Sequence, residues 1–366
     1  MSIDFYTIRE KKYLDFIQDE QKVSFITFRY MLPFRLPLPS GDGFVIGNTM
    51  FVPLHREYKH YTQNDEFLSL PIKRTVIETT IKIYKKDRIS AIKNNGSITK
   101  RDKVISQEFN KQLEALNNLI NIIIAKYKFT NIYPVHYGEI IGTVYNQLFK
   151  YNSKLIIETP LQLLVMLQLS PANSNDEITL QPQEIEEIMG KYYEYSKHEY
   201  NNVILAARKG ERAYQLYDYN SSIVHYNTMF EVLIATFVKH YYERMSRKTN
   251  KKIDNIVNDS GLKNLIECHF YIILGDLMIK DYKEIKSCID EYMKEGYIYR
   301  NKIVHNGENY GETEAIKTRE KMNDLSRLLN HNVRNAPKND FVDFYRKFNK
   351  NSHPDYYEET ISKYRG

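Results

Sequence analysis

The 366-residue sequence has no tryptophan and only two cysteines, Cys268 and Cys288. Two cysteines are too few for a disulfide scaffold or a zinc finger, and no second pair of metal ligands accompanies Cys268 and His269. No apolar run reaches the roughly 18 residues that suggest a membrane-spanning helix. Residues 1–5 lack the basic and apolar regions of a signal peptide. These absences predict a cytoplasmic protein with no membrane contact.

The sequence also lacks a large excess of positive or negative charge. The sequence has 52 Lys and Arg against 46 Asp and Glu, which gives a formal net charge of +6. Such a charge permits nucleic-acid binding through a local patch but does not require it. The 31 tyrosines are amphipathic, so many of them are expected at core edges and contact surfaces.

Strand-like patterns precede helix-like ones in the first 170 residues. The predicted strands lie at 23–30, 44–46, 50–52 and 75–84, and a helix is predicted at 106–127. Residues 133–168 are ambiguous, with 140–149 compatible with a helix and 154–169 with a strand followed by a helix. We therefore expect 1–170 to form an α+β domain, for which sensing and RNA recognition are both candidate roles.

A cluster of breaking residues at 171–176 predicts a domain boundary. After Pro182 nearly every segment has a helical period, and the short connections predict antiparallel neighbours. We expect an all-α bundle over 182–335, with helices at 183–207, 220–246, 262–279, 281–305 and 311–333. The last residues, 336–366, form a polar tail that we expect to be loosely attached.

The predicted helix 281–305 ends in Arg300, Asn301, Lys302, Ile303, Val304 and His305. At about 100° per residue, the apolar residues of this helix form one buried seam that reaches Ile303. Asn301 and His305 share a face nearly opposite the seam, and Arg300 lies near its edge. Gly307 is typical of a helix C-terminus, where the helix dipole favours a protonated imidazole.

These side chains suit the cleavage of an RNA phosphodiester. An imidazole exchanges protons near neutral pH, so His305 can accept a proton from a ribose 2′-hydroxyl or donate one to a leaving 5′-oxygen. Arg300 can bind the phosphate with two hydrogen bonds, and Asn301 can hold the phosphate or orient the imidazole. This chemistry needs no metal or cofactor, and none is expected.

One helix supplies a single histidine, although an acid and a base are both required. On a straight helix, Arg300 and His305 also point about 140° apart. A two-fold interface brings two copies of the motif together and resolves both difficulties. We therefore expect a homodimer with a composite site.

At these residues the sequence resembles the HEPN superfamily, helical-bundle proteins of prokaryotic defence, toxin–antitoxin and CRISPR systems. Their motif is Arg, often followed by a polar residue such as Asn, and then His slightly further along a late helix. The resemblance covers 185–333 and implies a metal-independent endoribonuclease of antiphage or stress defence. It makes Arg300 and His305 catalytic with Asn301 in support, and it gives Glu231, on an earlier long helix, a weaker supporting role.

Basic side chains are candidates for contacting the RNA backbone: Lys302, Lys248, Lys251 and Lys252. A competing interpretation pairs Arg300 with an acid such as Glu295 or Glu308 and makes His305 a solvated capping residue. The bundle would then be a non-catalytic binding or sensing module. An enzyme that cuts cellular RNA is toxic unless restrained, so an activator or inhibitor protein is a further expected partner.

Overall fold

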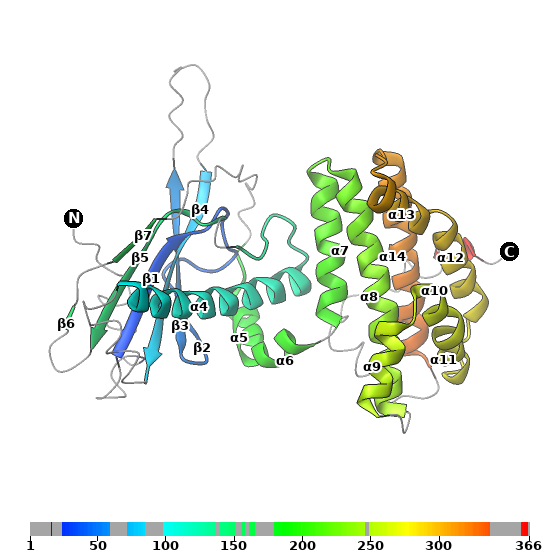
Figure 1. Ribbon diagram of the computed structural model, residues 1–366, viewed down its shortest axis with the longest axis horizontal. Coiled ribbons are helices and arrows are strands. Elements are labelled where there is room, and N and C mark those ends of the chain that lie inside the picture. The colour runs from blue at the N-terminus through cyan, green and yellow to red at the C-terminus, as the bar shows by residue number, and fades with distance from the viewer. Residues whose placement is uncertain are drawn as a thin grey trace, which may run out of the picture. The chain divides into compact units, whose positions relative to one another are not determined.

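The computed structural model describes residues 16, 24–58, 72–84, 98–136, 139–150, 156–157, 161–164, 179–198, 200–245, 249–336 and 360–364. They belong to two compact units (Figure 1). The first comprises Met1–Ile124 and Asn131–Lys197, and the second Ala125–Thr130 and His198–Gly366. The first contains a sheet and the second is helical, which confirms the predicted order of α+β and helical parts. The division follows residue 197, later than the predicted start of the bundle at 182, while 171–176 lies outside the described residues.

An antiparallel sheet forms the centre of the first unit (Figure 1). Its strands follow the order β2-β3-β4-β1-β5-β6, and β7 also pairs with β5. The strands are β1 (Ser24–Met31), β2 (Phe44–Ile46), β3 (Thr49–Tyr58), β4 (Ile72–Ile83), β5 (Ile141–Lys150), β6 (Ile156–Ile157) and β7 (Leu161–Leu164). The early strands were predicted, but the helix suggested at 140–149 is wrong. There the ladder with β1, which pairs Ser24 with Lys150 at one end, overrides a locally helical pattern.

Among the described residues, three helices accompany this sheet: α4 (Ile98–Tyr127), α5 (Pro182–Gly190) and α6 (Tyr192–Lys197). Aromatic packing joins α4 to the sheet, since the rings of Phe28 and Phe109 lie 5.2 Å apart between centroids. The hydroxyl of Tyr192 donates a hydrogen bond to the carbonyl oxygen of Ala115 at 3.1 Å, which ties α6 to α4. The sheet, α4 and α6 therefore form one packed body.

The second unit is built around α8, which packs against α7, α9, α13 and α14. Its elements are α7 (Tyr200–Gln215), α8 (Tyr219–Met245), α9 (Asn250–Asp259), α10 (Leu262–Leu265), the π-helical turn η3 (Ile266–Phe270), α11 (Tyr271–Asp276), α12 (Tyr282–Lys294), α13 (Gly296–Asn306) and α14 (Glu312–Arg334). Among the described helices of both units, none is both long enough and apolar enough to cross a membrane.

Three of the predicted helices are divided in the structure. Residues 262–279 contain the π-helical turn η3 between α10 and α11. Residues 183–207 are divided among α5, α6 and α7, and residues 281–305 are divided between α12 and α13 at Glu295. Glu295 has φ −118° and ψ −76°, outside the regular helical values. Apolar spacing did not indicate this break, because Tyr292 and Gly296 keep the four-residue interval across it. The angles derived for one straight helix therefore apply only within α13.

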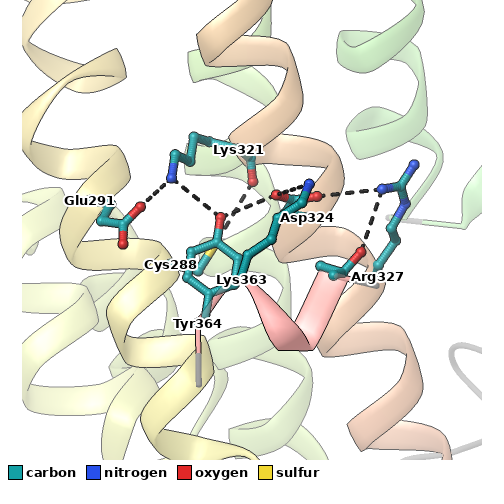
Figure 2. Close-up of polar contacts among 8 residues, drawn as sticks. Cys288, Glu291, Lys321, Asp324, Arg327, Lys363 and Tyr364 are labelled. Atoms are coloured by element: carbon teal, nitrogen blue, oxygen red, sulfur yellow. Dashed lines mark hydrogen bonds and ion pairs between the residues drawn. The ribbon is translucent and has the colours of Figure 1, made fainter. Parts of the chain in front are cut away.

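Residues 360–364 pack against the helical unit (Figure 2). Ile361 is fully buried and Tyr364 nearly so, and both belong to the apolar core of the bundle. The hydroxyl of Tyr364 donates to Oδ2 of Asp324 at 3.2 Å, and Nζ of Lys363 lies 3.4 Å from the same oxygen. The expectation of a loosely attached tail does not hold for this segment.

Replacing Ile361 by alanine is expected to lower the free energy of unfolding by about 2–5 kcal/mol, the usual range when a buried isoleucine leaves a cavity. Urea denaturation followed by circular dichroism measures this change. Ile361→Val is the matched control, since it removes a single methylene-sized group at the same position and the expected loss is only about 0.5–1.5 kcal/mol. Equal stability of the two variants would show that the segment does not contribute to the core.

Candidate functional site

A buried hydrogen-bond network holds the start of α13 against α8. The side-chain amide of Asn227 donates to the carbonyl oxygen of Gly296 at 3.2 Å and to that of Ile223 at 2.8 Å. The amide oxygen of Asn227 accepts a hydrogen bond from the hydroxyl of Tyr292, near the end of α12. Burial, and secondarily the charge of Glu231, raises the pKa of Tyr292 well above its ordinary value, so this hydroxyl keeps its proton. The network ties the start of α13 to α8 and to the end of α12.

Gly296 makes room for the ring of Tyr292 at this junction. A Cβ atom on Gly296 would lie 2.6 Å from Cε2 of Tyr292, closer than side-chain contacts allow. The carbonyl of the same glycine accepts the hydrogen bond from Asn227. Close packing, and not an unusual backbone conformation, therefore requires a glycine here.

The side chain of Arg300 lies between α13 and α8. Its Nη2 is 3.7 Å from Oε1 of Glu231, and its Nη1 donates to Oδ1 of Asn301 at 3.0 Å. The side chains of Arg300 and Glu231 are 27% and 34% exposed, so water screens the ion pair and its contribution to stability is small. The structure thus brings Arg300, Asn301 and Glu231 together, and the acid beside Arg300 is neither Glu295 nor Glu308.

His305 is exposed in the last turn of α13. The helix ends at Gly307, which has φ +67° and donates its backbone N–H to the carbonyl oxygen of Ile303 at 3.1 Å. The remaining carbonyl groups of the last turn concentrate partial negative charge near the imidazole. His305 and Arg300 lie on different sides of α13, as their spacing predicted for a helix.

The segment after α13 is anchored to the start of α8. The side-chain oxygen of Asn220 accepts a hydrogen bond from the backbone N–H of Tyr310 at 2.9 Å. The ring of Tyr310 packs on that of Tyr299, with centroids 4.9 Å apart, and its hydroxyl donates to Glu308 at 2.8 Å. These contacts fix the loop that follows His305.

Glu308 is a carboxylate close to His305 in sequence. Hydrogen bonds from the hydroxyl of Tyr310, and then from the amide of Asn306, lower the pKa of Glu308 and keep it ionised. Nζ of Lys302 lies 3.7 Å from Oε2 of Glu308, and both side chains are largely exposed. Because exposed ion pairs are weak, a phosphate can replace Glu308 as the partner of Lys302.

The other lysines predicted to contact RNA do not lie beside Arg300. Lys251 and Lys252 are exposed on α9, which follows the end of α8, whereas Arg300 contacts Glu231 within α8. From residue 231 to residue 245, α8 rises about 21 Å at roughly 1.5 Å per residue. Figure 1 accordingly shows α9 and α13 toward opposite ends of the bundle. Lys248 lies outside the described residues.

Asn220, Asn227 and Tyr310 position α13 but were not predicted from the sequence. Asn227 left a signal in the sequence, because it interrupts the apolar stripe of α8. Asn220, at the start of the same helix, belongs to the part of the sequence that resembles the HEPN bundles, but its contact with Tyr310 was not foreseen. Asn220 and Tyr310 meet across a long interval of sequence, which periodicity does not detect. Within the described parts of the chain, no group of three or more His, Cys, Asp or Glu side chains is placed to hold a metal ion.

No protein-family model matches the chain, and neither a curated protein nor a solved structure matches it.

Gly296→Ala is expected to lower the free energy of unfolding by about 1–3 kcal/mol, because the added methyl group overpacks against Tyr292. Gly275→Ala is the matched control: Gly275 is also helical, but nothing lies within 4 Å of its added Cβ. Because alanine has a higher helix propensity than glycine, Gly275→Ala should raise the free energy of unfolding by up to about 1 kcal/mol. Chemical denaturation compares the two variants, and a stabilised Gly296→Ala protein would refute the packing of this junction.

Proposed function

We propose that the chain is a HEPN-like, metal-independent endoribonuclease whose site is centred on α13. The observation that supports this proposal is the placement of Arg300, Asn301 and His305 on one short helix, with all three side chains at least partly exposed. Each group is therefore accessible to a polymeric substrate. The contacts of Asn227 and Asn220 hold both ends of this helix in place.

The proposed reaction is a transfer of the phosphodiester to the neighbouring 2′-oxygen. One imidazole accepts the proton of the ribose 2′-hydroxyl while that oxygen bonds to phosphorus. The bond from phosphorus to the 5′-oxygen breaks, and a second imidazole donates a proton to that oxygen. Arg300 stabilises the charge on the non-bridging oxygens, and Asn301 orients the guanidinium through the hydrogen bond already present.

Glu231 has a holding role in this scheme. It pairs with Arg300 at 3.7 Å, in a position where solvent weakens the pair. An RNA phosphate offers two oxygens to the planar guanidinium and can take over as its partner. The ion pair with Glu231 therefore orients the guanidinium of Arg300 and still allows it to bind an RNA phosphate.

A homodimer supplies the second imidazole. Ile298 and Val304 are exposed apolar residues of α13, and helical spacing places Asn301 and His305 between or beside them. Isolated exposed apolar residues are common, but two on the helix that carries the motif suit a two-fold contact between copies. An activator or inhibitor protein would then act by controlling this contact or access to it.

The second candidate function is a non-catalytic binding module. The ion pair between Arg300 and Glu231, together with the hydrogen bond to Asn301, favours it, because a structural arginine makes the same contacts. In this case Arg300→Ala lowers stability or affinity for a ligand, and the protein cuts no RNA under any condition.

Purified protein incubated with total RNA in EDTA is expected to cleave it, and Arg300→Ala and His305→Ala should each reduce the rate by at least about 100-fold, the scale of an acid–base or electrostatic group. The cleavage products are resolved by gel electrophoresis. His331→Ala, which alters a histidine at the far end of α14, is the control for loss of a histidine and should retain activity.

Unchanged cleavage of RNA by both Arg300→Ala and His305→Ala would contradict the assignment of the site to α13. Cleavage absent from every preparation, with intact folding by circular dichroism, would favour the binding module.

Mixing wild-type and His305→Ala subunits tests the composite site. If one site needs an imidazole from each copy, mixed dimers are inactive, and activity falls with the square of the wild-type fraction after subunit exchange. If each copy holds its own complete site, activity falls in direct proportion to that fraction. The proportional result would contradict the composite site while leaving the nuclease proposal standing.

A further inference from the structure

The C-terminal segment 360–364 is attached to the helical unit by few side chains. Ile361 and Tyr364 are the two apolar residues that it buries in the core of the bundle. Figure 2 shows Tyr364 between Glu291 of α12 and Asp324 of α14. Parts of a fold with few buried apolar contacts open at a lower free energy than the core. The segment is therefore the part of this unit that we expect to open while the helices stay folded.

The polar contacts of the segment lie at the long end of the hydrogen-bond range. Nη1 of Arg327 donates to Oγ1 of Thr360 at 3.5 Å, and Nζ of Lys363 lies 3.4 Å from Oδ2 of Asp324. The hydroxyl of Tyr364 donates to the same oxygen of Asp324 at 3.2 Å. Hydrogen bonds of such lengths are weak. They add little to what the buried apolar side chains of the segment contribute.

The groove beneath the segment keeps its charges paired when the segment leaves. Asp324 retains Arg327, whose Nη1 lies 3.4 Å from Oδ1 on the same helix. Lys321 of α14 retains its ion pair with Glu291 of α12. A buried charge left without a partner would oppose opening strongly. Here each charge has a partner on α12 or α14, so detachment exposes apolar surface without leaving a charge alone.

The segment also covers a thiol. Burial, and then the neighbouring Cys288 and Asp324, raise the pKa of Tyr364 well above its ordinary value. Cys288 is fully buried, and burial raises the pKa of its thiol to about 12. A buried thiol with a raised pKa is unreactive. The sequence has one other cysteine, the exposed Cys268, so a variant without it reports on Cys288 alone.

One turn of α12 connects the covered thiol to the candidate site. Cys288 and Tyr292 are four residues apart on the buried face of α12. The hydroxyl of Tyr292 donates to Asn227, and its ring lies against Gly296 at the start of α13. A loss of packing at Cys288 therefore reaches the start of α13 through a single helical turn.

We propose that the C-terminal segment 360–364 is a strap that detaches from the folded bundle and controls how firmly α12 and the start of α13 are held. When the strap is docked, Tyr364 joins α12 to α14. When it is detached, α12 loses this contact and Cys288 becomes accessible. The proposal concerns the packing of the helical unit and holds whether or not α13 cleaves RNA.

Thiol labelling of the full chain with 5,5′-dithiobis(2-nitrobenzoate), in a Cys268→Ser background, measures the detachment. Below the unfolding transition, the labelling rate should change little with urea, because a short segment exposes little surface. Ile361→Ala should raise this rate by at least about tenfold, since it removes a buried anchor of the strap, and Ile361→Val should raise it less. Circular dichroism establishes that each variant is folded.

Ile253→Ala is the matched control, because it truncates an equally buried isoleucine on α9. It should lower the stability of the bundle but leave the labelling rate of Cys288 within about twofold. Hydrogen exchange followed by mass spectrometry tests the connection to α13. The backbone amides of residues 288–300 should exchange faster in Ile361→Ala than in the parent protein, whereas Ile253→Ala should leave them unchanged.

Three results would overturn the strap. The first is labelling of Cys288 that follows the urea dependence of global unfolding. The second is an equal acceleration of labelling by Ile361→Ala and Ile253→Ala. The third is unchanged hydrogen exchange at 288–300 in Ile361→Ala.

Discussion

The amide of Asn227 is the buried group on which the geometry of the candidate site depends. It joins α8, the end of α12 and the start of α13 through hydrogen bonds with Tyr292 and Gly296. A buried donor or acceptor left without a partner costs about 1–3 kcal/mol. Removing the amide of Asn227 would therefore leave the hydroxyl of Tyr292 and the carbonyl of Gly296 without this partner. This side chain therefore ties the start of α13, the helix that carries Arg300 and His305, to α8 and α12.

The two ends of α13 are fixed by different means. Its start is held by a buried network, whereas the loop after its end is held at the surface by Asn220 and by the packing of Tyr310 on Tyr299. Between these anchors the outer face of the helix makes few contacts, and its apolar residues Ile298 and Val304 remain exposed. A rigid helix with an open face suits both a catalytic group that must be positioned within a fraction of an ångström and a contact with a second copy.

The sequence predicted most of the regular elements because their signals are local. β-Branched residues indicated β1 and β4, and the apolar stripe indicated α8. These sequence-based predictions failed where contacts distant in sequence matter. β5 is a strand that pairs with β1, and the start of α13 is hydrogen-bonded to Asn227 of α8. Ile361 is another case, since one apolar residue in a polar segment gives no periodic signal.

For the candidate site, the sequence singled out Arg300, Asn301, His305 and Glu231 as candidates, and the structure supplies the contacts that these side chains make. The spacing of Arg300 and His305 predicted that they point to different sides of a helix, and both residues lie in α13. Glu231, considered a weaker candidate, lies in α8 and pairs with Arg300. The distance of Lys251 and Lys252 from Arg300 was not foreseen, because it follows from the length of α8 and not from any spacing near the motif. Exposure of Ile298 likewise depends on how the bundle packs.

The proposed composite site requires that α13 of one copy faces α13 of another. Spin labels at position 298 test it directly, introduced as Ile298→Cys in a Cys268→Ser background that removes the exposed native cysteine. A label at the exposed Met278, outside α13, provides the comparison. Electron–electron distance measurements should give a short, narrow distance between labels at 298 and a longer one between labels at 278. The absence of any distance between copies, or a longer distance at 298 than at 278, would contradict the account.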